Sequence, residues 1–251
     1  MGKIVAIGGG EIGRPRKNGG NYPVETTAID KEMIKLSGRS HPNLLFIPTA
    51  SGDSESYFDV IKTHFGERLG CKCNVLMLTK EKLKKNEIKE KIMSADIIYV
   101  GGGNTLKMLI LWRKFGVDRF LYSAYKKGIV LSGVSAGAIC WFKSGISDSR
   151  QKSTNKNSGY ISVKGLGILP LTLSPHFFTE KKRRHAIMQM VKKYKQIFAI
   201  DDCAALEIVD DKYKIIASKK GRTMHRFTYN NSKTTVFPIS LGKFRPIEDI
   251  M

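Results

Sequence analysis

One short stretch of this sequence, from residue 128 to residue 142, restricts the possible fold more than any other. The apolar residues Ile129 to Leu131, bounded by glycine, are typical of a short buried strand. They lead into Gly133-Val134-Ser135-Ala136-Gly137, and the small and apolar residues from Ala136 to Phe142 can open a helix. A strand, a tight turn with a serine at its tip and a helix form the context of a nucleophile elbow, in which glycines let strand and helix approach closely. The alternative is a small-residue turn with a structural role only.

Apolar runs alternate with helical patterns through the first half of the chain. The expected strands cover residues 3–7, 43–47, 74–78, 96–100 and 129–131, with helices between them. This alternation predicts an α/β fold, a three-layer sandwich whose mostly parallel central sheet is covered on both faces. Because the loops at the carboxyl ends of parallel strands build the sites of such sheets, residues 8–11, 49–53 and 101–105 should share one edge with Ser135.

The second half follows a different pattern. Residues 143–158 are polar and predicted to form a loop, and residues 180–194 are predicted to form a basic helix. The expected strands between residues 197 and 237 are separated by turn residues, so this part is predicted to be antiparallel. Since neither a long linker nor a repeat interrupts the sequence, we expect a single domain spanning residues 1–251.

Composition narrows the classes of function. The formal net charge is +21, with 43 Lys and Arg against 22 Asp and Glu, but the excess is mostly scattered lysine and no nucleic-acid-binding module is present. We therefore expect no nucleic-acid partner, although the charge would attract acidic small molecules and peptides. No apolar run approaches the roughly 18 residues of a membrane span. The four cysteines lack metal-binding spacing, so we expect reduced thiols, no metal site and a cytoplasmic protein.

A glycine loop at residues 101–105 is the first candidate partner of Ser135. The sequence Gly101-Gly102-Gly103-Asn104-Thr105 lies between a predicted strand and a predicted helix. It could cradle a phosphate, but it lacks the Lys-Ser/Thr ending of a P-loop. An acyl-transfer serine needs a second backbone donor for the oxyanion, and a glycine in a neighbouring loop can approach closely enough to supply it. A glycine turn without any catalytic role is the alternative.

A serine nucleophile also needs a base and a group that orients this base. Among five histidines, His176 in Ser174-Pro175-His176-Phe177 is the best placed, because it ends an apolar segment and precedes a helix. Four acids could orient this base. Asp148 lies between the serine and the histidine in sequence, and the other candidates are Glu180, Asp201 and Asp202.

These motifs together resemble the peptidase E (aspartyl dipeptidase) and cyanophycinase family of serine peptidases. The resemblance rests on the glycine loop at 101–105, on Gly133 to Ala138 and on the segment around His176, and it extends from about residue 3 to residue 217. Similar blocks occur at Gly8-Gly9-Gly10, Ile47-Pro48-Thr49-Ala50 and Asp201-Asp202-Cys203-Ala204-Ala205-Leu206.

The resemblance implies a fold like that of class I glutamine amidotransferases, with serine in place of their cysteine. It implies Ser135 as nucleophile, His176 as base and Asp148 as the third member of a triad, or a Ser135–His176 dyad if that acid is absent. The oxyanion donors would be the amides of Ala136 and of Gly102 or Gly103. Family members act on an N-terminal aspartate or on β-aspartyl–arginine polymer, which implies cationic groups that recognise a carboxylate. Arg183 resembles the position that the family uses, and Arg150 is a second candidate.

The sequence therefore predicts a serine peptidase that hydrolyses short peptides, prefers an acidic N-terminal residue, forms an acyl-enzyme and needs neither a metal nor an organic cofactor. It would work as a monomer or a homodimer. One alternative is a cyanophycinase-like or amidotransferase-like hydrolase that acts on another amide. The other is a non-catalytic binding protein recruited to anionic partners.

Overall fold

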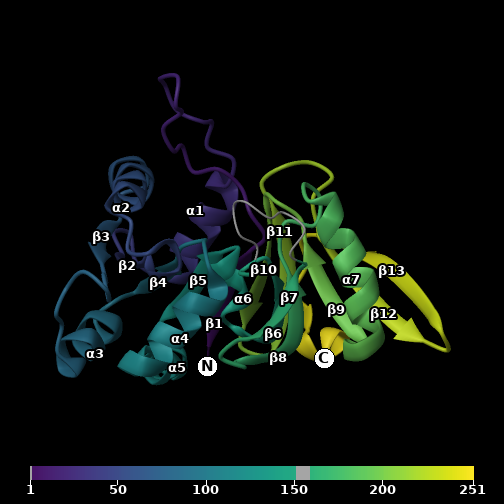
Figure 1. Cartoon of the computed structure of the whole chain (residues 1–251). Helices are drawn as coiled ribbons and strands as arrows, with labels where there is room; N and C mark the ends of the chain where they lie inside the picture. The colour runs from purple at the N-terminus through teal and green to yellow at the C-terminus, as the bar shows by residue number, and fades with distance from the viewer. Residues whose placement is uncertain (1, 151–158) are drawn as a thin grey trace.

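The computed structural model describes residues 2–150 and 159–251, which form two β-sheets with helices packed against them (Figure 1). The central sheet has eight strands in the order β14-β11-β10-β1-β5-β4-β2-β3. Five of them are parallel neighbours: β1 (Lys3–Ile7), β5 (Val130–Val134), β4 (Ile97–Val100), β2 (Asn43–Ile47) and β3 (Lys72–Val75). Their carboxyl ends share one edge, as predicted, and Ser135 directly follows β5, which lies between β1 and β4.

Three further strands extend this sheet in the antiparallel sense. β10 (Ala204–Val209) pairs with β1, β11 (Lys212–Ala217) pairs with β10, and the two-residue β14 (Arg245–Pro246) pairs with β11. The start of β10 therefore lies beside the end of β1, where Ala205 is opposite Ile7. This register brings the residues before β10 to the same edge as the loops after the parallel strands.

Helices cover both faces of the central sheet because its strands alternate their apolar side chains between the two faces. Val5 and Ile7 pack in one cluster with α1 (Thr27–Leu36), α2 (Glu55–Ile61) and the π-helical segment Lys62–Arg68. Ile4 and Ala6 pack in the other cluster with α3 (Lys85–Met93), α4 (Thr105–Phe115), α5 (Val117–Lys126) and α6 (Ala136–Ile139). The predicted three-layer α/β arrangement is thus confirmed.

The second sheet has six strands in the order β13-β12-β9-β8-β6-β7. Their bounds are β6 (Phe142–Ser147), β7 (Ile161–Lys164), β8 (Leu169–Ser174), β9 (Gln196–Ile200), β12 (Met224–Asn230) and β13 (Lys233–Ile239). One face joins the larger cluster of the central sheet, and α7 (Lys181–Tyr194) covers the other face through Ile187 and Val191. Short 3₁₀ helices lie at Thr49–Ser51 and Ile247–Ile250.

Two details of this sheet differ from the sequence predictions. The helix after Ser135 ends at Ile139 and not at Phe142, and residues 142–147 form the buried strand β6 where a polar loop was predicted. The strands between residues 197 and 237 pair with one another in the antiparallel sense, as predicted, whereas β6 pairs in parallel with β8 and β8 pairs in parallel with β9. The small polar residues of β6 fit this buried position because they bond within the sheet: the hydroxyls of Ser144 and Thr172 lie 2.8 Å apart.

Residues 10–26 form an arm that protrudes from the carboxyl edge of the central sheet, the purple segment at the top of Figure 1. Two isolated antiparallel bridges hold it, Ile12 with Val24 and Pro15 with Asn21. No helix in the described part of the chain is long and apolar enough to cross a membrane.

Candidate active site

Ser135 occupies a strained turn directly after β5. Its φ of 56° and ψ of −108° are unusual for a residue with a side chain, and its N–H donates to the carbonyl of Ile7 at 3.1 Å. The flanking glycines are required by space, because a Cβ on Gly137 would overlap the carbonyl oxygen of Val100. The strand–turn–helix geometry predicted for this segment is therefore present.

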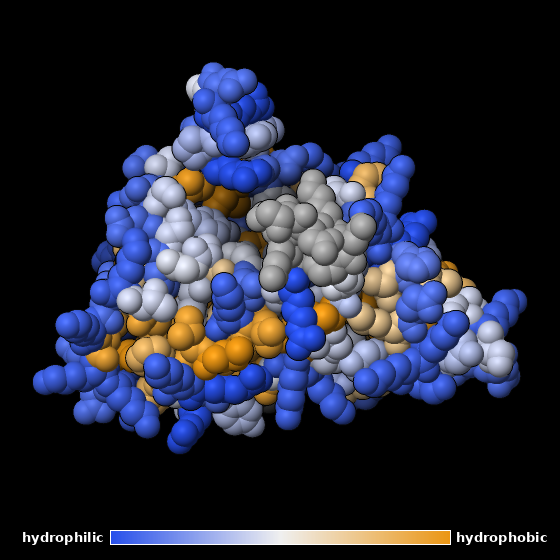
Figure 2. Space-filling model, in the orientation of Figure 1, coloured by the Kyte–Doolittle hydropathy of each residue, from blue (hydrophilic) through white to orange (hydrophobic). Residues whose placement is uncertain are grey.

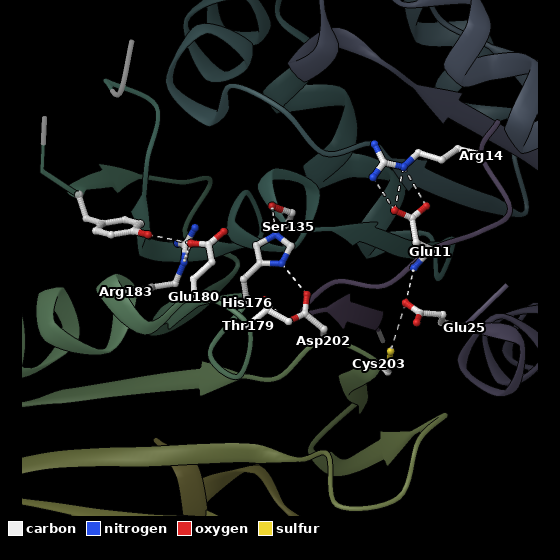
Figure 3. Close-up of polar contacts among 11 residues, drawn as sticks. Glu11, Arg14, Glu25, Ser135, His176, Thr179, Glu180, Arg183, Asp202 and Cys203 are labelled. Carbon is white, nitrogen blue, oxygen red and sulfur yellow. Dashed lines mark hydrogen bonds and ion pairs between the residues drawn. The ribbon is translucent and has the colours of Figure 1, made fainter. Parts of the chain in front are cut away.

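His176 lies beside Ser135 although 41 residues separate them in sequence. It follows β8, has a φ of 55°, and its N–H donates to the carbonyl of Gly8 at 3.2 Å. Its Nε2 is 2.8 Å from Ser135 Oγ (Figure 3). That distance is within hydrogen-bond reach, so His176 can accept the proton of the serine hydroxyl.

Asp202 provides the carboxylate on the far side of the imidazole. Its Oδ1 lies 2.6 Å from His176 Nδ1, and Thr179 Oγ1 donates to its Oδ2 at 2.7 Å (Figure 3). Burial alone would raise the pKa of Asp202, but the hydrogen bonds and the charge of His176, together with Thr179, bring this pKa below its ordinary value. A Cβ on Gly9 would overlap Asp202 Oδ1 and lie 2.6 Å from His176 Nδ1. Glycine is therefore needed at position 9, where the loop after β1 contacts the His176–Asp202 pair.

The prediction that Asp148 orients the histidine does not agree with this geometry. Asp148 is exposed in the turn after β6, and within the described residues it makes no hydrogen bond to His176. Its neighbour Ser149 holds the start of α4: the Asn104 amide donates to the Ser149 carbonyl at 2.9 Å, and Leu106 N–H donates to Ser149 Oγ at 3.2 Å. The turn is thus held against the start of α4, whereas the imidazole is bonded to Ser135 and Asp202.

The other two acids that the sequence left open are occupied elsewhere. Asp201 Oδ2 accepts from the N–H of Thr223 at 3.0 Å and lies 3.2 Å from His225 Nε2. Glu180 binds Arg183, whose Nε donates to Glu180 Oε2 at 2.7 Å. Burial would raise the pKa of Glu180, but the adjacent Arg183 lowers it below the ordinary value.

The predicted oxyanion donors lie next to the serine. A Cβ on Gly102 would lie 3.6 Å from Ser135 Cβ, so a side chain at this position would lie against the serine, and both residues line the same cavity. The Gly102 N–H points to Tyr57 Oη at 3.4 Å, which is a long hydrogen bond. Gly103 has a φ of 138° and no space for a Cβ beside Ala50. As the first residue of α6, Ala136 has an N–H without an intrahelical acceptor.

The two arginines predicted to bind substrate have different surroundings. Arg183 is only 2% exposed, and besides Glu180 it binds the carbonyl of Ile146 through Nη1 at 2.8 Å and covers the ring of Tyr160 at 4.7 Å. Its guanidinium thus already serves to connect α7 with β6. Arg150 is exposed at the edge of the described residues, and the structure gives it no contact with Ser135 or His176.

A cavity of about 600 Å³ opens onto Ser135 and His176. Its other lining residues come mainly from the arm, from α2 and from Gly102, and they include Glu11, Ile12, Arg14, Tyr57 and Val60. The space-filling view shows a hollow with hydrophobic residues beneath the protruding arm (Figure 2). The sequence places residues 8–11 at the carboxyl edge of the sheet but singles out neither Glu11 nor Arg14, because the arm has neither helical nor strand periodicity. Among the described residues, no three His, Cys, Asp or Glu side chains are grouped as metal ligands.

The chain is similar in sequence to known peptidases. The chain is 35% identical over 242 residues to the uncharacterized peptidase YgaJ of Bacillus subtilis, covering 95% of this chain and 97% of YgaJ. It is 26% identical over 220 residues to peptidase E of Shewanella denitrificans, covering 82% and 87%.

Two solved structures share the fold. One is a peptidase from an acI-B1 Actinobacterium, with a TM-score of 0.68, 19% identity and coverage of 98% of this chain and 97% of that one. The other is a putative peptidase E protein from Listeria monocytogenes, with a TM-score of 0.58, 19% identity and coverage of 96% and 100%. A model of peptidase family S51 matches residues 18–216, so the chain belongs to this family of peptidases and is a serine-type hydrolase.

Proposed function

We propose that Ser135, His176 and Asp202 are a catalytic triad that removes an acidic N-terminal residue from short peptides. The observation that carries this proposal is an unbroken chain of hydrogen bonds. Ser135 Oγ lies 2.8 Å from His176 Nε2, and His176 Nδ1 lies 2.6 Å from Asp202 Oδ1. The acidic preference is supported by the positive net charge of the chain and by its likeness to a protein named peptidase E.

In the first half of the reaction, Ser135 Oγ attacks the carbonyl carbon of the first peptide bond while its proton passes to His176 Nε2. The backbone N–H groups of Gly102 and Ala136 donate to the oxygen that becomes negative. When the tetrahedral intermediate collapses, the C–N bond breaks and His176 returns the proton to the leaving amine. The product left on the enzyme is an ester between Ser135 and the former N-terminal residue.

In the second half, a water molecule gives a proton to His176 Nε2 and attacks the ester carbonyl. Collapse breaks the bond to Ser135 Oγ, which regains its proton, and the free amino acid leaves. Asp202 keeps the imidazole in the tautomer with the proton on Nδ1 and stabilises its cationic form. The lowered pKa of Asp202 favours the ionised carboxylate that this role requires.

We further place this activity in the cytoplasm, since all four cysteines are unpaired thiols. Within the site, Tyr57 contributes a neutral hydroxyl, because burial raises the pKa of this phenol. In this form it can fill the space beside the Gly102 N–H until a substrate oxygen takes its place.

The test is a hydrolysis panel of purified protein and Ser135→Ala with Asp-Leu, Ala-Leu, Leu-Asp, Asp-amide and Asp methyl ester. Release of free amino acids is followed by chromatography. The proposal predicts the highest kcat/KM for Asp-Leu and loss of all turnover in Ser135→Ala. Faster turnover of the simple amide or ester than of any dipeptide would instead indicate an amidotransferase-like hydrolase, and activity retained in Ser135→Ala would contradict the assignment of the nucleophile.

A further inference from the structure

The cavity at Ser135 contains two opposite charges that are bound to each other. Arg14 Nε lies 2.8 Å and 3.0 Å from the two carboxylate oxygens of Glu11, and Arg14 Nη2 lies 2.7 Å from Glu11 Oε1. Both residues line the cavity together with Ser135 and His176. Figure 3 shows the pair at the side of Ser135 opposite to Glu180 and Arg183.

The backbone under Glu11 is firmly held. Its N–H donates to Glu25 Oε2 at 3.1 Å, and its carbonyl accepts from the Glu25 N–H at 2.7 Å. Lys219 in turn binds Glu25 and lowers the pKa of that carboxyl, so Glu25 remains an acceptor. The carboxylate of Glu11 therefore projects from a fixed point in the loop after β1, and Gly9 and Gly10 of this loop line the same cavity.

The guanidinium of Arg14 is accessible and only partly used. Its side chain is 62% exposed, and Glu11 is 25% exposed. Among the described residues, no hydrogen bond is made by Arg14 Nη1, so two of its donors can bind a ligand. An exposed pair of this kind contributes at most about 1 kcal/mol, so a ligand can share or rearrange it at little cost.

The order of charges around the nucleophile matches one class of ligand. An N-terminal aspartyl or glutamyl residue carries an ammonium group and a carboxylate a few bonds from the carbonyl that Ser135 attacks. The planar fork of an arginine suits a carboxylate, and a carboxylate that still has unused lone pairs suits an ammonium. Ile12, Val60 and Val134 supply the apolar wall for the methylene groups between them.

We propose that the Glu11–Arg14 pair is the specificity-determining site for the N-terminal residue of the substrate: Arg14 binds its side-chain carboxylate and Glu11 binds its α-ammonium. This assignment rests on the proposed function of Ser135. It gives the arm a role, because Ile12, Arg14 and Pro15 of the arm line the cavity that opens onto Ser135. It also places carboxylate recognition on Arg14, in place of Arg183 and Arg150.

The experiment measures binding without turnover. Ser135→Ala is titrated by calorimetry with Asp-Leu, Asn-Leu and N-acetyl-Asp-Leu, alone and combined with Arg14→Gln, Glu11→Gln or Arg16→Gln. Arg16 is a matched control, because Arg14 and Arg16 each lie 4.9 Å from the Tyr22 ring but only Arg14 lines the cavity.

Arg14→Gln is expected to raise the Kd of Asp-Leu roughly 10- to 100-fold and that of Asn-Leu less than about 3-fold, as for loss of a hydrogen-bonded charge. Glu11→Gln is expected to weaken Asp-Leu and to reduce its advantage over N-acetyl-Asp-Leu. Arg16→Gln should change none of these values by more than about 2-fold. The proposal is overturned if Arg14→Gln affects Asp-Leu and Asn-Leu equally, if it matches Arg16→Gln, or if Asp-Leu does not bind to Ser135→Ala.

A failure of this inference differs from a failure of the proposed function. In the chain with Ser135 intact, a fluorophosphonate should label the unmodified protein and Arg16→Gln at the same rate, since Arg16 does not line the cavity. If the unmodified protein is labelled but Arg14→Gln does not change the Kd of Asp-Leu, only the specificity proposal is wrong. Absence of labelling in the unmodified protein removes the catalytic proposal, whatever the binding data show.

Discussion

Two glutamate–arginine pairs lie on either side of Ser135, and each has the same spacing of three residues in sequence. In the first, Glu180–Arg183, the arginine is 2% exposed and is bound by a carboxylate, a backbone carbonyl and an aromatic ring. In the second, Glu11–Arg14, the arginine is 62% exposed and lines the cavity. A charged side chain can therefore bind a ligand only if its existing partners leave donors or acceptors unused, whatever its residue type or spacing in sequence.

The same rule distinguishes Asp202 from Asp148, and the largest expected effect on activity concerns these two residues. Asp202→Asn should lower kcat on Asp-Leu about 10⁴-fold, because an amide stabilises the wrong tautomer of His176 and cannot balance its positive charge. Asp148→Asn should change kcat less than about 3-fold. Steady-state kinetics of the two variants, with circular dichroism to confirm folding, test this. If both variants lost kcat equally, Asp148 would again be a candidate for the catalytic acid.

Arg183→Met should cause the largest loss of stability among the arginine variants. It leaves Glu180 and the carbonyl of Ile146 without their partner, which we expect to lower the free energy of unfolding by about 3 kcal/mol. Urea denaturation followed by fluorescence measures this change. A loss below about 1 kcal/mol would show that Arg183 is not a structural residue and would make it available again for substrate binding.

The Glu180–Arg183 pair should also make a pH-dependent contribution to the free energy of unfolding. The pKa of Glu180 is lowered in the folded protein, so its contribution is complete above the unfolded value of about 4.5 and is lost as the pH falls through the lower folded value. The stability difference between the unmodified protein and Glu180→Gln should therefore be at most about 1 kcal/mol at pH 7 and shrink as the pH falls below about 4.5. A difference that grows on acidification would have the wrong sign.

Arg14→Gln should have the smallest effect on folding. Because this pair is solvent-exposed, we expect the free energy of unfolding to change by less than about 0.5 kcal/mol, while binding of acidic dipeptides weakens. The same urea titration serves as the measurement. A loss comparable to that in Arg183→Met would mean that both pairs are structural and would remove the contrast between them.

The sequence predicted those parts of the site that local patterns determine. The strand before Ser135, the glycine turn around it and the loops at residues 8–11 and 101–105 all follow from short apolar runs and glycines. His176 was found because it ends such a run. The helix after Ser135 was predicted too long, because β6 pairs with the distant β8 and ends the helix early, and no local pattern announces that pairing.

Asp202 and Arg14 illustrate what local patterns cannot decide. Asp201 and Asp202 are adjacent in sequence, and the turn between β9 and β10, with a φ of 62° at Cys203, sends one toward His225 and the other toward His176. The arm that carries Arg14 has only two isolated bridges, so its position depends on tertiary contacts such as that between Glu11 and Glu25.

The most direct test of the account is the site at which the protein becomes acylated by a fluorophosphonate. Labelled protein is digested, and the modified residue is identified by mass spectrometry in the unmodified chain, Ser135→Ala, Asp202→Asn and Asp148→Asn. We predict one adduct on Ser135, none in Ser135→Ala, much slower labelling in Asp202→Asn and an unchanged rate in Asp148→Asn. An adduct on another residue, or labelling of Ser135→Ala at the normal rate, would contradict the assignment of Ser135 as the nucleophile.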